Sequence, residues 1–483
     1  MEKVSPVDLE KHVDSSSVGS DQAVVDPQLE ARVWGKLDLW ILPVVAMFYL
    51  LSFLDRTNIG NAKVAGLLKD LDMTPRQYSI ALTVTYVPYI AAELPSNLLL
   101  KTVGANRMLP TMITLWGVVT ACQGAVTSYG GLLVCRFFLG LLEGGVFPGI
   151  VLYLSCFYPR LKLQTRVSGF LSTASLAGAF GGILAYGIIQ LNGKHGHSGW
   201  QWIFIIEGVI TSFIGLISFP VLPATPETAR FLNKEEKAYV KARLVEDGVI
   251  NEAADSFSWG EVAKGFTSIH VLISSVLFFF GGVVLYSLAY FAPSIIQSLG
   301  YSASKAQLMS VPPFSVAFVL TMITAWISDR YHCRGAVSVL SAVFCVIGFS
   351  MFLGSKNHHV QYASLFLSVT GSYIQACSVS TWNANNSAPL VRRATAIAFA
   401  FIMTNSGGIL STWLLGSLSA PPFYTKATKI LLSFSVLMAV FSVLNMAYLA
   451  NENRKKAQMR KDISREDEDP SLGDRSAWFV YSL

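Results

Sequence analysis

The chain has 483 residues, of which 52% are hydrophobic and only 14% are charged. Soluble domains carry roughly 25% charged residues, so this composition argues against a soluble protein and indicates one that lies in a bilayer. The formal net charge of +6 does not indicate nucleic-acid binding, because the Lys and Arg residues are scattered and many flank apolar stretches, as cytoplasmic anchors do.

The first 36 residues are polar and lack the charged-then-apolar pattern of a secretory signal peptide. We expect residues 1–36 to form a disordered cytoplasmic tail. The first apolar stretch would then act as the insertion signal.

Twelve apolar stretches follow, and a helix needs about 20 such residues to cross the hydrocarbon of a bilayer. Their approximate cores are 38–58, 78–98, 109–127, 132–155, 167–190, 202–222, 270–295, 306–327, 336–354, 362–384, 395–416 and 430–450. The sequence therefore predicts an all-α membrane protein with twelve transmembrane helices.

The one long polar insert divides these stretches into two groups of six. We expect an N-terminal six-helix bundle over 37–222, a central cytoplasmic loop over 223–268, a C-terminal six-helix bundle over 269–450 and a cytoplasmic tail over 451–483. Within the loop, Asn233 followed three positions later by Glu236 predicts a capped amphipathic helix. Two pseudo-symmetric bundles are typical of a carrier that binds its substrate between them and opens to each side in turn.

Loop charges indicate the orientation, because Lys and Arg gather on the cytoplasmic side of membrane proteins. With the amino terminus inside, the short loops show a mild bias in this direction, and the central loop and the basic carboxyl tail strengthen it. An even number of spans then places both termini in the cytoplasm.

The six Cys residues show no CxxC or zinc-finger spacing, so neither a disulfide framework nor a metal site is expected. No GxxxxGK[ST], HExxH or GxSxG motif occurs, which argues against an ATP-driven pump or a membrane enzyme. We therefore expect no cofactor and no enzymatic activity.

Four charged residues interrupt stretches that otherwise read as membrane-spanning: Asp55 and Arg56 in the first, and Arg136 and Glu143 in the fourth. A charge at the centre of a lipid-exposed helix costs from roughly 3 to above 10 kcal/mol, so these side chains are expected to face partners or a wet cavity. Asp55 and Arg136 both lie toward the outer side. Glu143 follows Arg136 by two helical turns, which places it on the same face about 10 Å deeper.

These two acids and two bases predict a proton-coupled anion site. Arg56 is the candidate ligand of a substrate carboxylate, because a guanidinium binds a carboxylate with two parallel hydrogen bonds. Binding would leave excess negative charge, and a proton on Glu143 or Asp55 would restore neutrality, so one proton would move with one anion. Static ion pairs between helices remain an alternative, above all for Arg136. Glu207, also within a span, is interpreted as structural.

Polar and aromatic residues of other spans are candidates for the lining of the pocket, since ligand pockets combine apolar walls with a few placed polar groups. They are Tyr89 in the second span, Tyr286 and Tyr290 in the seventh, Trp382 in the tenth and Asn405 in the eleventh. Each could equally form a hydrogen bond between helices.

Several strings resemble the major facilitator superfamily, and within it the anion:cation symporter branch with its fungal permeases of the allantoate and nicotinate type. These strings are LSFLDRTNIGNA, ELPSNLLLK, CRFFLGLLEGGVFPG, SLAGAFGGILAYGI and WIFIIEG. The resemblance covers nearly the whole chain outside the tails. Its most specific part is the Asp55-Arg56 pair together with the spacing from Arg136 to Glu143.

The resemblance implies roles for the charged residues. In related symporters the arginine matching Arg56 holds the substrate carboxylate, and the acids matching Asp55 and Glu143 carry protons. The acid matching Asp55 also pairs with the arginine matching Arg136. Tyr89, Trp382 and Asn405 match positions that line the pocket of relatives.

The resemblance therefore implies a plasma-membrane symporter of a proton and a small organic anion of carboxylate, vitamin or ureide type. We expect a monomer whose partners are the substrate, the proton and the lipid bilayer. An exporter of an acidic secondary metabolite has the same fold and remains an alternative. A non-transporting nutrient sensor is a further alternative, which the short carboxyl tail disfavours.

Overall fold

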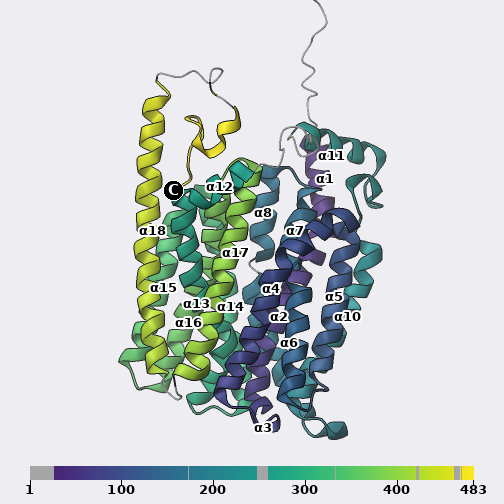
Figure 1. The fold of residues 1–483 in the computed structure, drawn as a ribbon, viewed down its shortest axis with the longest axis vertical. Coiled ribbons are helices and arrows are strands. Elements are labelled where there is room, and N and C mark those ends of the chain that lie inside the picture. The colour runs from purple at the N-terminus through teal and green to yellow at the C-terminus, as the bar shows by residue number, and fades with distance from the viewer. Residues whose placement is uncertain are drawn as a thin grey trace, which may run out of the picture.

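The computed structural model describes residues 27–171, 173–246, 259–331, 333–419, 424–461, 468 and 470–483. Within these ranges the chain is almost entirely helical and contains no β-strand. Figure 1 shows long helices running side by side along the long axis, with α3 at one end and both α1 and the C-terminus at the other. The predicted all-α fold is confirmed.

The described part of the N-terminal half consists of helices joined by short connections. They are α1 (Pro27–Trp40), α2 (Leu42–Val64), α3 (Leu67–Asp70), α4 (Pro75–Val103), α5 (Ala105–Gln123), α6 (Tyr129–Glu143), α7 (Val146–Ser155), α8 (Arg160–Leu171), α9 (Thr173–Ile188), the 3-10 turns η1 (Ile189–Leu191) and η2 (Lys194–Gly196), and α10 (Gly199–Val221).

The central segment and the C-terminal half continue in the same way. Their elements are η3 (Pro226–Thr228), α11 (Lys234–Glu246), α12 (Trp259–Thr267), α13 (Ile269–Ser298), α14 (Ala303–Tyr331), α15 (Arg334–Gly354), α16 (His358–Asn385), α17 (Leu390–Trp413), the π-helical turn η4 (Leu414–Leu418), α18 (Thr425–Met459) and the 3-10 turn η5 (Pro470–Arg475).

Reciprocal hydrogen bonds between an N-cap residue and the third helical residue fix two helix starts. At α4, Gln77 N donates to Thr74 Oγ1 (3.2 Å), and Thr74 N donates to Gln77 Oε1 (2.8 Å). At α11, Glu236 N donates to Asn233 Oδ1 (2.8 Å), and Asn233 N donates to Glu236 Oε2 (2.9 Å). These capping boxes satisfy backbone groups that a helix end leaves free, and the second lies at the start of α11 in the central segment.

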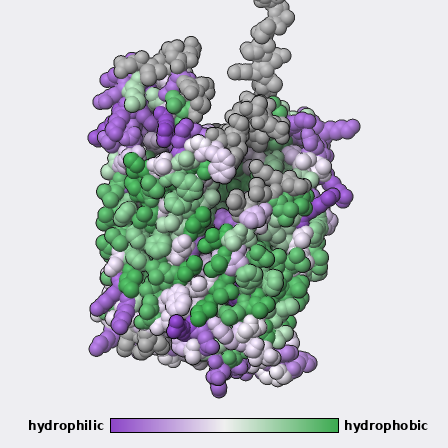
Figure 2. All heavy atoms as spheres, in the orientation of Figure 1, coloured by the Kyte–Doolittle hydropathy of each residue, from purple (hydrophilic) through white to green (hydrophobic). Residues whose placement is uncertain are grey.

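The outer surface of the helices suits a lipid environment. Figure 2 shows hydrophobic residues over the middle of the face drawn, with hydrophilic residues gathered toward the two ends. On α10, Val209, Phe213 and Leu216 lie on one helical face and are 57%, 62% and 56% exposed. Such an exposed apolar stripe would be unfavourable in water, whereas lipid tails cover it in a bilayer.

Nine helical segments of the described chain are long and apolar enough to cross a membrane. The stretches predicted at 78–98, 109–127 and 362–384 form α4, α5 and α16, which pack within the two bundles. Together these segments account for the twelve predicted spans.

Small residues allow the helices of each bundle to approach closely. A β-carbon on Gly117 of α5 would lie 2.5 Å from Ser212 Oγ of α10, and one on Gly371 of α16 would lie 2.5 Å from the carbonyl oxygen of Ser341 of α15. Only glycine fits at such distances, so these helix pairs pack backbone against backbone, as helices often do in lipid.

The two bundles are in direct contact at the α3 end of the molecule. Ser79 Oγ of α4 donates to the carbonyl oxygen of Thr412 in α17 (3.0 Å), and Gln307 Nε2 of α14 donates to the carbonyl oxygen of Asn61 in α2 (3.3 Å). A β-carbon on Gly60 would clash with the carbonyl oxygen of Tyr290 in α13. These contacts close the bundle interface at the end opposite to the described chain ends (Figure 1).

Two predicted boundaries are wrong. Residues 27–36, expected in a disordered tail, belong to helix α1, and α18 continues past residue 450 to Met459. Ion pairs hold α1 in place, between Arg166 and Asp38 (2.7 Å) and between Lys36 and Glu236 (2.8 Å). Such contacts join segments distant in sequence, so the local pattern did not reveal them. Residues 1–26 of the tail and 247–258 of the central loop lie outside the described residues.

Candidate functional site

A buried ion pair between α2 and α6 forms the centre of the candidate site. Arg56 Nε donates to Glu143 Oε1 at 2.6 Å, and Ser52 Oγ donates to the same oxygen at 2.5 Å. Arg56 is 9% exposed and Glu143 is 1% exposed. Ser52 lies one helical turn before Arg56 and therefore shares its face, so α2 presents two donors to one carboxylate.

Arg56 also reaches the C-terminal bundle. Its Nη1 donates to Tyr286 Oη of α13 at 2.7 Å, and Tyr286 Oη donates to Asn405 Oδ1 of α17 at 3.5 Å. The guanidinium carbon lies 4.7 Å from the centre of the Tyr89 ring and 5.6 Å from that of the Phe53 ring. The cation is thus held by one carboxylate, by a hydroxyl and by aromatic faces, which attract it further.

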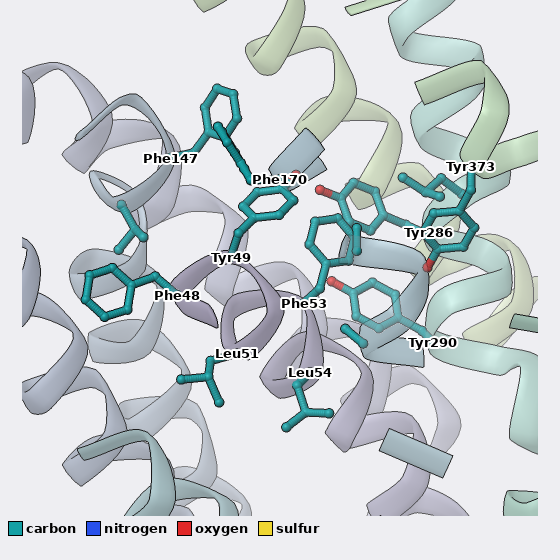
Figure 3. Packing of buried hydrophobic residues seen from close by; sticks show 14 of the residues in the cluster. Phe48, Tyr49, Leu51, Phe53, Leu54, Phe147, Phe170, Tyr286, Tyr290 and Tyr373 are labelled. Carbon is teal, nitrogen blue, oxygen red and sulfur yellow. The ribbon is translucent and has the colours of Figure 1, made fainter. Parts of the chain in front are cut away.

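Aromatic side chains cover the Arg56–Glu143 pair on the side of α3. Tyr86 of α4 and Tyr290 of α13 share a hydrogen bond of 2.7 Å between their hydroxyls. Figure 3 shows the rings of Tyr286 and Tyr290 reaching from α13 toward Phe53 of α2. Because these residues come from both bundles, they join the bundles just beyond the ion pair.

A second aromatic contact covers the pair on the side of the chain ends. Phe147 of α7 lies four residues after Glu143, and its ring centre is 4.0 Å from that of Phe401 in α17. Tyr49 and Phe170 pack around Phe147 (Figure 3). Aromatic contacts therefore lie on both sides of the Arg56–Glu143 pair, which agrees with the low exposure of both side chains.

Asp55 and Arg136 lie inside the N-terminal bundle and do not form the expected ion pair. Asp55 accepts hydrogen bonds from Asn58 Nδ2 (3.2 Å) and Thr120 Oγ1 (3.3 Å). Arg136 lies with its guanidinium carbon 5.7 Å from the ring centre of Phe204. Within the described part of the chain, its Nε and Nη2 have no hydrogen-bond partner. Adjacent helical residues point about 100° apart, so Arg56 faces the bundle interface and Asp55 faces α5 and α10.

The predicted lining residues separate into two groups. Tyr89 contacts the Arg56 guanidinium, and Asn405 is linked to it through Tyr286. Trp382 lies elsewhere: its Nε1 donates to the carbonyl oxygen of Ser482 in the carboxyl tail at 2.8 Å. These contacts therefore do not support the prediction that Trp382 is a substrate ligand. The sequence alone did not reveal that the carboxyl tail packs against this side chain.

Sequence reasoning missed two residues with direct contacts in these clusters. Ser52 is uncharged and does not stand out in the sequence, although its position one turn before Arg56 indicates a shared face. Glu207, which the sequence suggests is structural, accepts a hydrogen bond from Asn58, which also donates to Asp55. The signal was present in the sequence, since a second buried acid in a span rarely lacks a partner or a function.

Two helix bundles that enclose a charged, aromatic-lined centre define a membrane carrier. Consistent with this class, the model of the Major Facilitator Superfamily matches residues 45–412. The chain belongs to the major facilitator superfamily of membrane transporters, as the sequence resemblance implied.

Individual relatives are similar over nearly their whole length. The chain is 35% identical to "Uncharacterized transporter C1002.16c" of Schizosaccharomyces pombe, over 93% of this chain and 89% of that protein. It is 30% identical to the "High-affinity nicotinic acid transporter" of Saccharomyces cerevisiae, over 99% and 90% respectively. Among solved structures, a bacterial homologue of the human lysosomal transporter Spinster shows the same fold, with a TM-score of 0.64 and 14% identity over 84% of this chain and 96% of that one.

Proposed function

We propose that this transporter is a secondary active carrier that moves a small organic anion by symport with a proton. The observation that carries this proposal is the buried Arg56 guanidinium, which lies between the bundles, contacts both of them and forms an ion pair with Glu143. A guanidinium held in this way can bind a carboxylate. In this structure the carboxylate of Glu143 takes that place.

Substrate binding and proton uptake are linked through this pair. An incoming carboxylate takes the hydrogen bonds that Arg56 now gives to Glu143, and Glu143 is left buried without its cation. Leaving one member of a buried ion pair without its partner costs about 3–5 kcal/mol. A proton on Glu143 removes this cost and makes the loaded site neutral, so proton and anion move in the same direction.

The contacts around Arg56 support a small carboxylate with an apolar body. We propose that Arg56 binds the carboxylate, that Tyr89 packs against the rest of the substrate and that Asn405 supplies a polar contact from the second bundle. The nicotinic acid transporter of yeast, whose name states a small aromatic carboxylate, agrees with this substrate class. Alternating access would then consist of closure at the α3 end, which the contacts there support, and of opening at that end when the bundles rock apart.

The orientation and location are part of the same proposal. Both described chain ends lie at one end of the molecule (Figure 1), as expected when both termini face the cytoplasm. We propose that the protein works as a monomer in the plasma membrane.

The test is uptake of a panel of small carboxylates into proteoliposomes under an imposed inward proton gradient. Wild-type protein is expected to accumulate at least one carboxylate, and Arg56→Ala is expected to accumulate none. Arg76→Ala is the matched control, because Arg76 is an exposed arginine at the start of α4. Equal accumulation by Arg56→Ala and wild type would refute the role of the guanidinium.

A further inference from the structure

A second group of buried acids lies in the N-terminal bundle, away from the bundle interface. Asp55 of α2 and Glu207 of α10 are 2% and 1% exposed, and Asn58 lies between them with no exposure at all. The amide nitrogen of Asn58 donates one hydrogen bond to Asp55 Oδ1 and another to Glu207 Oε2. Two carboxyl groups are therefore hydrogen-bonded to the same nitrogen atom.

Two ionised carboxylates in this arrangement would repel each other strongly. Their oxygens lie within hydrogen-bonding distance of one atom, and burial removes the water that would screen them. Thr120 adds one further donor to Asp55. Hydroxyl and amide donors soften the repulsion but supply no positive charge, so they do not balance two buried negative charges.

The charged groups around the two acids do not provide that balance either. Arg56 is already paired with Glu143 on α6. Arg136 of α6 acts on Asp55 only through space, and in the part of the chain that the structure describes neither Asp55 nor Glu207 forms an ion pair with it.

The neighbouring helices add little further charge. The titratable groups that face Arg136 are Tyr78 of α4 and Tyr290 of α13, together with Asp55 and Glu143, and the tyrosines are neutral at ordinary pH. If both acids were ionised, the net charge of this buried cluster would be one negative unit, from the carboxylates of Asp55 and Glu207 and the guanidinium of Arg136.

Unpartnered polar atoms show that this cluster is incomplete as it stands. Among the described residues, Glu207 Oε1, Asn58 Oδ1 and the Arg136 Nε and Nη2 groups are buried and have no hydrogen-bond partner. A carboxylate oxygen and a carbonyl oxygen can each accept a proton donor, and the free guanidinium groups can bind a carboxylate. The cluster thus lacks one proton on its acidic side.

We propose that Glu207 shares one proton with Asp55, so that the two carboxyl groups hold it between them. Glu207 is then a proton-holding residue of the carrier. The role of this proton in transport rests on the proposed function. The proton itself is detectable without any transport.

The geometry connects this proton to the substrate site. Asp55 and Arg56 are neighbours on α2, and Arg136 and Glu143 share a face of α6. The same two helices therefore carry two acid–base positions, of which Arg56–Glu143 is formed and Asp55–Arg136 is open. A proton held by Asp55 and Glu207 would therefore lie beside the substrate site, on a helix that carries part of it.

The test is infrared spectroscopy of the purified full-length protein in lipid nanodiscs. A protonated carboxyl group gives a C=O stretching band that an ionised one lacks. Wild-type protein is expected to show such a band at neutral pH. Glu207→Gln is expected to lose the share of this band that comes from Asp55 and Glu207. In that variant Asp55 is the one acid left beside Arg136, so it ionises. Glu207→Asp, which keeps a carboxyl group, is expected to retain that part of the band.

A merely structural Glu207 gives a different result. Gln offers the same acceptor oxygen to Asn58, so a structural role predicts an unchanged spectrum for Glu207→Gln, and this outcome would overturn the proposal. If that variant does not fold, the absence of any protonated-carboxyl band in wild-type protein would overturn it equally. Glu227→Gln serves as the control, since Glu227 is an exposed partner of Lys241. Failure of proton-driven uptake in wild type would instead refute the proposed function and leave this spectrum unaffected.

Discussion

Replacement of Glu143 by Gln is expected to tighten anion binding and to abolish proton-driven accumulation. In the structure, Glu143 Oε1 takes hydrogen bonds from Arg56 (2.6 Å) and Ser52 (2.5 Å), and in the proposed mechanism a substrate displaces it. Gln keeps an acceptor oxygen but removes the charge, so the internal competitor of the substrate becomes weaker. If about 1.4–2.8 kcal/mol of the buried ion pair is lost, the substrate binds roughly ten- to a hundredfold more tightly.

Two assays on the same proteoliposomes separate these effects. Counterflow exchange at equal pH reports binding and conformational change, and accumulation under a pH gradient reports coupling. Glu143→Gln is expected to keep exchange, with a lower half-saturating concentration, and to show no accumulation. Ser52→Ala is the matched control, since it removes a neutral hydrogen bond to the same oxygen and leaves the charge. Weaker binding by Glu143→Gln, or undiminished accumulation, would refute the reasoning.

Two further predictions concern regions outside the ion pair. Gly60→Ala places a methyl group against the Tyr290 carbonyl and should hold the α3 end open, so a Ser79→Cys thiol should react faster with an impermeant maleimide; unchanged labelling would contradict this. Burial raises the pKa of Glu236, but the hydrogen bonds from Lys36 and from the Asn233 backbone, together with the charges of Lys36 and Arg32, outweigh it and lower the pKa. Ionised Glu236 therefore stabilises the fold above its unfolded pKa, and this contribution is lost as pH falls. Glu236→Gln should cost about 1 kcal/mol at pH 7 and less near pH 4 in thermal unfolding; an equal loss at both pH values would contradict this.

The helices could be predicted from the sequence because lipid imposes a single rule on every span, namely a long apolar helix with its backbone bonds satisfied internally. The stretches expected at 202–222 and 336–354 correspond to α10 (Gly199–Val221) and α15 (Arg334–Gly354). The stretch expected at 132–155 is interrupted, since α6 ends at Glu143 and α7 begins at Val146. At this break Gly144 lies close to the backbone of Tyr89 in α4, a tertiary contact that the local sequence pattern does not reveal.

The site was only partly predictable for a similar reason. Depth in the membrane follows from position along a helix, and it correctly marked Arg56, Asp55 and Glu143 as buried charges within spans. The direction in which each side chain points depends on how the helices pack. The sequence therefore did not show that Arg56 faces the interface while Asp55 faces α10, nor that the carboxyl tail takes the hydrogen bond of Trp382.

In the proposed mechanism the Arg56 guanidinium receives the substrate carboxylate, and a proton travels with it. The most direct test of this mechanism is the simultaneous recording of proton and labelled carboxylate entry into proteoliposomes that contain wild-type or Arg56→Ala protein. We predict that the two fluxes rise together, one proton for each carboxylate, in wild type and that both vanish in Arg56→Ala. Carboxylate entry with no accompanying proton, or carboxylate entry that survives the loss of Arg56, would contradict the account.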